Sequence, residues 1–125
     1  MNKRVPRSGE IWMCALEKSE GSVQSGYRPV LILSNDKNNT YSPTLNVIPI
    51  TSKMNKRKLP VHVELWDYWK YGLKTSSTLM IEQITTVPAN SLGYYMGAIE
   101  DEDVLIDICN AFCVQFPIMQ MVSSA

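Results

Sequence analysis

The chain has 125 residues with 12 basic and 12 acidic side chains, so its formal net charge is zero. This length fits one domain, which we expect to span residues 1–125, and the 45% apolar content excludes a disordered chain. No apolar run reaches the roughly 20 residues that cross a membrane. The charged N-terminus lacks the apolar segment of a signal peptide, so we expect a soluble, cytoplasmic protein.

Short apolar runs between turn residues predict most of the secondary structure. We expect strands over residues 10–16, 29–33, 44–50, 61–65, 78–84 (extending to 87) and 94–99. Residues 34–43, rich in Asn and Asp, predict a long turn. The apolar spacing of residues 102–116 predicts a helix, with Asp101 as its N-cap and Pro117 as its stop. Strands at close intervals with one terminal helix predict a mainly β fold, a small barrel or a strongly bent sheet.

The cysteine and histidine content excludes two kinds of site. The three cysteines form no disulfide framework, and with His62 as the single histidine no familiar zinc site can be assembled. His62 alternates with apolar neighbours, which favours a residue on the polar face of a strand over a catalytic base. We therefore expect no metal and no cofactor.

The zero net charge hides a strong segregation of charge. Residues 1–74 hold all 12 cations and six of the acids, whereas residues 75–125 hold the other six acids and no cation. The densest basic stretch, residues 53–58, has four cations in six residues. Such a loop either neutralises phosphates of a polyanion or is only a solvated surface loop.

Four polar side chains at the ends or in the middle of apolar strands are candidates for chemistry. Arg28 presents a planar fork that suits a phosphate, and the hydroxyls of Thr51 and Ser52 can hydrogen-bond its oxygens. Gln83 carries an amide that can read a base edge. Each also has a structural interpretation: a surface ion pair for Arg28, a strand-end residue for Thr51, and a satisfied core amide for Gln83. The aromatic stretch 66–71 suits base stacking, a packed flap or a subunit contact.

Seven short motifs follow one another in an order that resembles the MazF/PemK family of toxin endoribonucleases. They are Gly9-Glu10-Ile11-Trp12, Gly26-Tyr27-Arg28-Pro29-Val30-Leu31-Ile32, Ser34-Asn35-Asp36, Tyr41-Ser42-Pro43-Thr44, Ile50-Thr51-Ser52, Lys58-Leu59-Pro60-Val61-His62-Val63-Glu64 and Ile81-Glu82-Gln83-Ile84-Thr85-Thr86. The match runs from about residue 8 to residue 113. Each motif alone is weak, and their order is what makes the resemblance specific.

The resemblance implies a homodimer of SH3-like, CcdB/MazF-like barrels that cuts single-stranded RNA at a short sequence, as an mRNA interferase, without metal. In such a family member Arg28 and Thr51 are the catalytic pair, and a cognate antitoxin covers the RNA groove with an acidic segment. The residues that line the RNA are then Ser22, Ser52, Lys53, Lys56, Arg57, Lys58, Leu59 and Gln83.

The chain departs from the family after the Glu-Gln-Ile motif, where many relatives carry Arg or Lys. Here residues 85–92 hold no cation. The general base is also unassigned: Glu82 is one candidate, and no side chain at all is the other.

The expected reaction is attack by the ribose 2′-OH on the adjacent 3′-phosphate, which gives a 2′,3′-cyclic phosphate and a 5′-OH. This chemistry needs neither metal nor protein nucleophile, which suits a chain poor in histidine. Two other functions stay open, because a fold does not fix a function. One is a CcdB-like gyrase poison that cuts nothing, and the other is a non-catalytic RNA-binding module.

Overall fold

The computed structural model describes residues 4–17, 26–52 and 58–121, most of which form β-strands and their connections. The strands there are β1 (Glu10–Leu16), β2 (Gly26–Ile32), β3 (Thr44–Thr51), β4 (His62–Leu65), β5 (Ser77–Met80), β6 (Thr85–Pro88) and β7 (Leu92–Ala98). The α-helices are α1 (Asp36–Tyr41) and α2 (Glu102–Gln115), and the 3₁₀ helices are η1 (Tyr68–Tyr71), η2 (Ile81–Gln83), η3 (Ala89–Ser91) and η4 (Pro117–Gln120). No helix of the described segments is long and apolar enough to span a membrane.

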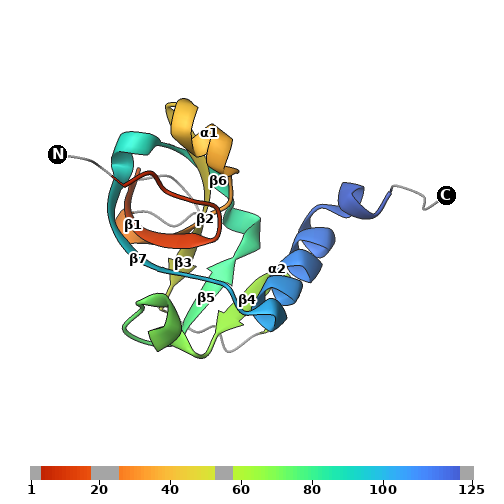
Figure 1. Ribbon diagram of the computed structural model, residues 1–125. Coiled ribbons are helices and arrows are strands. Elements are labelled where there is room, and N and C mark those ends of the chain that lie inside the picture. The colour runs from red at the N-terminus through yellow and green to blue at the C-terminus, as the bar shows by residue number, and fades with distance from the viewer. Residues whose placement is uncertain (1–3, 18–25, 53–57, 122–125) are drawn as a thin grey trace.

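The strands form one antiparallel sheet in the order β4-β5-β3-β2-β1-β7, and β6 pairs with β3. Figure 1 shows β1, β2, β3, β6 and β7 curving around a small barrel, while β4 and β5 extend from it toward α2. Strand β3 belongs to both parts: residues 44–49 pair with β6 and β2, and its last two residues pair with β5. The expected class, a mainly β SH3-like barrel with short helices and a C-terminal helix, is confirmed.

Two separate apolar cores explain why the first three strands are almost continuously apolar. In β2, Val30 and Ile32 face one core, and Leu31 faces the other. Side chains alternate across a strand, so a strand with a core on each face needs apolar residues at every position. The smaller core, inside the barrel, consists of Trp12, Cys14, Leu16, Val30, Ile32, Leu45, Val47 and Val87.

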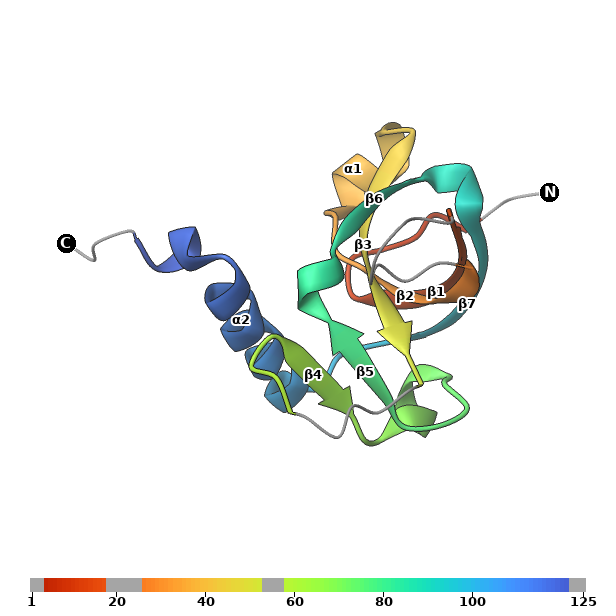
Figure 2. The ribbon, with the colours of Figure 1, turned by 180° about the vertical axis from the view of Figure 1, so that it is seen from behind.

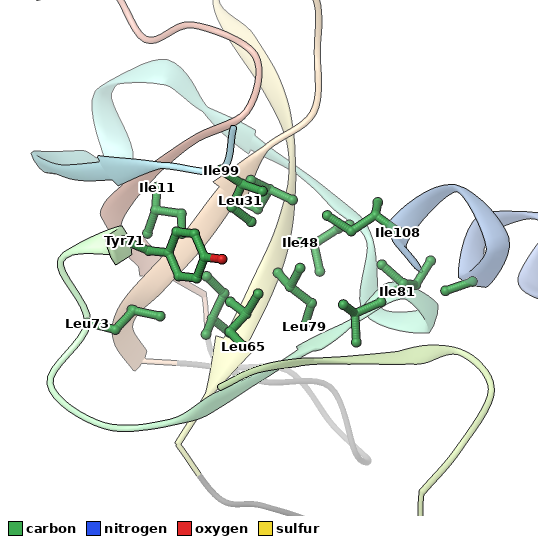
Figure 3. Packing of buried hydrophobic residues seen from close by; sticks show 13 residues of the cluster. Ile11, Leu31, Ile48, Leu65, Tyr71, Leu73, Leu79, Ile81, Ile99 and Ile108 are labelled. Atoms are coloured by element: carbon green, nitrogen blue, oxygen red, sulfur yellow. The ribbon is translucent and has the colours of Figure 1, made fainter. Parts of the chain in front are cut away.

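The larger core lies between the sheet, η1 and α2. Figure 3 shows the ring of Tyr71 among the apolar side chains of several strands, with Ile108 reaching in from α2. The hydroxyl of buried Tyr71 donates a hydrogen bond of 2.9 Å to Asp101, immediately before α2. Burial opposes the charged form of Asp101, but the hydrogen bonds from Tyr71 and Lys70 outweigh it and hold the pKa of this carboxyl below its usual value. This contact joins η1 to the start of α2.

The helix α2 agrees with its predicted span to within one residue, but Asp101 does not act as a side-chain cap. Asp101 occupies the N-cap position in an extended conformation and makes no capping hydrogen bond, because its carboxylate accepts from Tyr71 instead. Pro117 follows the last turn of α2, and it begins η4. In Figures 1 and 2 the C-terminal half of α2 leads away from the barrel.

Two predicted elements are wrong. Residues 34–43 contain the helix α1 instead of a long turn, because Asn35 caps it by accepting a hydrogen bond of 2.8 Å from the Asn38 amide. Asn39 is buried and exchanges hydrogen bonds with Ser34. The predicted strand 78–84 is divided into β5 and β6 by η2, whose residue Ile81 packs into the larger core.

Two glycines with positive φ give a matched stability test. We expect Gly72→Ala to lower the free energy of unfolding by about 2–5 kcal/mol, because φ is +74° and the added Cβ would overlap the Met96 carbonyl on β7. Gly26→Ala, with φ of +87° and no neighbour within 4 Å, costs only about 1 kcal/mol of conformational strain. Urea unfolding measures both, and equal losses would contradict the close approach of η1 to β7.

Candidate active site

Arg28 and Thr51 lie two residues beyond the paired part of strands β2 and β3. These strands pair Ile32 with Val47 and Val30 with Pro49. Extending the same antiparallel register by two residues would put Arg28 across from Thr51, at the end of β3. On its opposite edge β3 pairs with β5 there, so that Thr51 lies opposite Thr78. The register favours a site that holds both side chains, and their catalytic pairing stays a prediction.

A pocket of about 490 Å³ opens beside Arg28. Strands β1, β2, β3 and β7 and the residues from 73 to 77 contribute its wall. The lining residues are Met13, Tyr27, Arg28, Pro29, Ile50, Ser52, Leu73, Lys74, Thr75, Ser77, Tyr94 and Met96. Among the described residues, Arg28 and Lys74 are the charged members of this lining, and no carboxylate belongs to it. A pocket with cations, hydroxyls and exposed phenol rings suits a phosphate group attached to an aromatic base.

Polar residues on the two neighbouring strands lie in register with Thr51. Thr51 is buried, and its strand partner Thr78 is only 1% exposed. The Thr78 hydroxyl donates a hydrogen bond of 2.8 Å to Glu64 on β4. Glu64 is not among the site residues predicted from the sequence, although it lies in a short strand that alternates polar and apolar residues. The hydrogen bond to the Glu64 carboxylate fixes the rotamer of Thr78, which is the cross-strand neighbour of Thr51.

Glu82, the predicted candidate for a general base, is held by histidine. Its Oε2 lies 2.8 Å from Nε2 of His62, whose side chain is only 4% exposed. His62 Nδ1 and Glu82 Oε1 are buried without hydrogen-bond partners. Glu82 does not line the Arg28 pocket, since it sits in η2, beyond the end of β5 that is remote from Ser77. The structure therefore does not bring Glu82 into the pocket of Arg28, and it buries the His62 side chain in a hydrogen-bond contact with Glu82.

The predicted RNA-lining residues of the described chain do not all line one pocket. Ser52 is exposed and lines the Arg28 pocket, whereas Lys58 and Leu59 line a second pocket of about 560 Å³ between β4 and α2. Gln83 is half-buried at the end of η2. The remaining four lie outside the described residues: Ser22, Lys53, Lys56 and Arg57.

The aromatic stretch 66–71 has two roles. Tyr71 belongs to the larger core, and Tyr68 packs against that core and edge-on to Trp69, with ring centroids 5.4 Å apart. Trp66 and Trp69 are exposed, and Trp66 borders the second pocket. The residues that sequence reasoning missed at the Arg28 pocket are Tyr27, Lys74 and Tyr94, because they come from three separate segments with no common motif.

The described part of the chain contains neither a cluster of metal ligands nor an activated Cys14 thiol. Within residues 4–17, 26–52 and 58–121, no group of three or more His, Cys, Asp or Glu side chains is arranged to hold a metal ion. Cys14 is buried, and desolvation raises the pKa of its thiol, which disfavours the nucleophilic thiolate. The predicted lack of a metal requirement stays a prediction.

Comparison with known proteins identifies the family. The family model described as a PemK-like, MazF-like toxin of type II toxin–antitoxin systems matches residues 7–116. The chain belongs to this family. It is 41% identical to the Endoribonuclease MazF of Staphylococcus saprophyticus over 96 residues, which cover 77% of this chain and 79% of the relative. The resemblance and the enzyme class expected from the sequence agree with both matches.

Solved structures of MazF toxins share the fold. The toxin MazF-mt6 of Mycobacterium tuberculosis superposes with a TM-score of 0.71 at 24% identity, covering 86% of this chain and 96% of its own. MazF from Deinococcus radiodurans gives 0.72 at 22% identity, covering 95% and 100%. A mycobacterial endoribonuclease solved in complex with its cognate antitoxin gives 0.67 at 20% identity, covering 95% and 99%. At sequence identities of 20–24%, these structures are evidence for a shared fold only.

The His62–Glu82 contact gives a prediction about stability. We expect His62→Ala to lower the free energy of unfolding by about 2–3 kcal/mol, because it leaves the partly buried Glu82 carboxylate without its partner. In the double variant with Glu82→Ala, the loss should be smaller than the sum of the two single losses.

Asp67→Asn is the control for this measurement. Asp67 pairs with Lys70 at 3.4 Å, with both side chains about half exposed, so its removal should leave the urea midpoint unchanged. Additive losses for His62→Ala and Glu82→Ala would show that the two side chains are not coupled.

Proposed function

We propose that this toxin is an mRNA interferase, an endoribonuclease that cleaves single-stranded RNA at a short sequence. The relative with 41% identity is named as an endoribonuclease. The observation that carries the proposal is the pocket lined by Arg28 and Lys74, next to the end of a β2–β3 pairing whose register, continued by two residues, would set Arg28 across from Thr51.

The reaction is an in-line transesterification. The 2′-oxygen of one ribose forms a bond to its own 3′-phosphorus, and the bond from that phosphorus to the 5′-oxygen of the next nucleotide breaks. The 2′-OH gives up its proton and the leaving 5′-oxygen takes one up, so the products are a 2′,3′-cyclic phosphate and a 5′-OH. The nucleophile belongs to the substrate, which restricts the reaction to RNA, because DNA lacks the 2′-OH.

Arg28 is the proposed electrostatic catalyst. Its guanidinium is always charged and presents a rigid fork of donors to the phosphoryl oxygens, where negative charge develops in the transition state. The same high pKa makes arginine a poor proton acceptor. Thr51 is the proposed anchor of the phosphate, with its backbone fixed by pairing to Thr78.

The identity of the general base depends on the His62–Glu82 contact. Glu82 would have to leave His62, at 2.8 Å, before it reached a substrate in the Arg28 pocket. The other expectation, that no side chain acts as the base, therefore suits the geometry better. In that case the proton of the 2′-OH passes to solvent, and catalysis rests on charge stabilisation and positioning.

Removing the two proposed catalytic groups tests the mechanism. We expect Arg28→Ala to abolish cleavage of a long RNA transcript and Thr51→Val, which keeps the shape of the side chain, to slow it about 10²–10³-fold. Arg7→Ala is the matched control, because Arg7 is an exposed arginine that pairs with Asp36 at 3.4 Å, away from the pocket. Cleavage is followed in EDTA, and the ends are mapped to identify the cyclic phosphate and the cut sequence.

The outcomes of this assay separate the competing functions. Site-specific cuts in EDTA that disappear with Arg28→Ala support the proposed nuclease. Cuts at the wild-type rate in Arg28→Ala contradict the assignment of the site. Intact RNA with inhibited DNA gyrase indicates a CcdB-like poison, and intact RNA that shifts in a gel indicates an RNA-binding module.

We also propose that the toxin is a homodimer and that a cognate antitoxin regulates it. Several large apolar side chains of α2 and η4 are exposed, which favours burial against a second copy. They are Leu105, Ile106, Val114, Ile118, Met119 and Met121. An acidic antitoxin segment matches the cations of the Arg28 pocket and would exclude RNA from it; a mycobacterial endoribonuclease of the same fold has been solved with its antitoxin.

Light scattering tests the dimer. We expect the wild-type protein to have the mass of two chains and Ile118→Glu to shift it toward one chain, because a charge would then lie in an apolar contact. Tyr41→Glu is the control, since Tyr41 is an exposed apolar residue on α1. A monomeric wild-type protein, or an Ile118→Glu variant that stays dimeric, would contradict this interface.

A further inference from the structure

The wall of the Arg28 pocket contains a second cation that comes from outside every motif of the family resemblance. Lys74 lies in the connection between η1 and β5, is exposed, and lines the pocket. Among the described residues it forms no ion pair, whereas Lys70 nearby is shared between Asp67 and Asp101. Lys74 is thus a lysine whose charge no neighbouring carboxylate of the described chain neutralises.

The segment that carries Lys74 is held at both ends. Leu73 is buried in the larger core, and Gly72 adopts the left-handed conformation that turns the chain after η1. On the other side, the buried Ser77 hydroxyl donates a hydrogen bond of 2.9 Å to the Thr75 carbonyl. Lys74 therefore stands at the pocket wall on a fixed backbone, so a ligand that binds it does not pay the cost of ordering a free loop.

Two exposed tyrosines line the same pocket. Tyr27 is 57% exposed and Tyr94 is 56% exposed, although both line the pocket wall. Tyr94 also borders a neighbouring apolar pocket that includes Trp12 and Tyr95, so its ring lies on the ridge between the two hollows. Exposed aromatic rings next to an unpaired cation are typical of sites that stack nucleobases and neutralise phosphates.

The lack of a side chain at Gly93 leaves room for the ring of Tyr27. A Cβ at Gly93 would overlap the Tyr27 hydroxyl and lie 3.0 Å from its ring carbon Cζ. Strand β1 lies between β2 and β7, so the Tyr27 side chain crosses β1 to reach Gly93, over about 10 Å between the outer strands. The bare backbone at Gly93 thus allows the phenol to lie flat along the rim of the pocket.

We propose that Lys74, Tyr27 and Tyr94 form a subsite for the nucleotide next to the scissile phosphate. Lys74 binds the adjacent phosphate, and the two phenol rings accept the base of that nucleotide by stacking. This subsite supplies a cation beside the scissile position in a chain whose residues 85–92 hold none. The inference rests on the proposed nuclease function and deepens it by naming residues that bind RNA without taking part in bond breaking.

Binding of an uncleavable oligonucleotide tests the subsite separately from catalysis. The probe is a fluorescein-labelled RNA that contains the mapped cut sequence, with a single 2′-deoxy nucleotide at the cut position to remove the nucleophile. Fluorescence anisotropy over a range of salt concentrations gives the Kd and its salt slope. Lys74→Ala should weaken binding at low salt about 5–10-fold and reduce the slope of log Kd against log salt by about 0.7, the value for one lost phosphate contact on a single strand.

Removal of an aromatic ring should change the Kd but not its salt dependence. Tyr94→Ala should weaken binding about 5–100-fold without changing the salt slope, because stacking releases no counterion, and Tyr94→Phe should bind as the wild type does. Gly93→Ala should weaken binding in the wild-type background and have no effect in a Tyr27→Ala background, if it acts by displacing that ring.

Controls come from α1, which lines neither the Arg28 pocket nor the pocket between β4 and α2. Lys37→Ala and Tyr41→Ala remove an exposed cation and an exposed ring there, and both should leave the Kd and the salt slope unchanged. Suppose that the wild type cuts and binds RNA. If Lys74→Ala then has the wild-type salt slope, or Tyr94→Ala has the wild-type Kd, the proposed subsite is wrong and the proposed nuclease function is unaffected. If the wild type neither cuts nor binds RNA, the proposed function fails and the subsite fails with it.

Discussion

The alternation of buried side chains along β1, β2 and β3 is the constraint on which the rest of the structure depends. These strands contribute to the barrel core with one face and to the larger core with the other. Burial of a large aliphatic side chain is worth about 1.5–3 kcal/mol, and a slip of one residue would exchange the two faces of a strand. The register of β2 against β3 is therefore fixed by two cores at once.

The site arises where β3 leaves one partner for another. Its early residues pair with β6 and β2, and its last two pair with β5. On the opposite edge of β3, the pairing with β2 ends at Val30 and Pro49, and Arg28 lines one pocket with residues of the segment from Leu73 to Ser77. The pocket therefore combines residues from distant parts of the chain on backbone that regular pairing holds rigid, which suits catalysis by positioning and charge.

The segregation of charge along the chain has a spatial counterpart. In the part of the chain that the structure describes, the Arg28 pocket is lined by two cations from the first 74 residues and by no carboxylate. Acidic residues of the C-terminal part lie on and before α2, among them Asp101, which accepts the Tyr71 hydrogen bond, and Asp107, which borders the pocket between β4 and α2. A net charge of zero thus coexists with a local field that attracts a polyanion to one opening.

The sequence by itself determined most of the strand positions, the terminal helix and the family resemblance. Continuous apolar runs and a helical repeat report burial directly, and the motifs around Arg28, Thr51 and Gln83 occur in one order. Sequence patterns were misleading where a side chain had a tertiary partner. Asn35 and Asn39 indicated a turn but form the cap and the buried contact of α1, and Asp101 indicated a cap but bonds to Tyr71.

Only the tertiary structure decided which residues share a pocket. It brought Lys74 and Tyr94 to Arg28, and it engaged Glu82 with the buried His62. The physical reason is that periodicity reports which side of an element is buried, whereas partners far apart in the chain are chosen by sheet order and register, which no local pattern encodes.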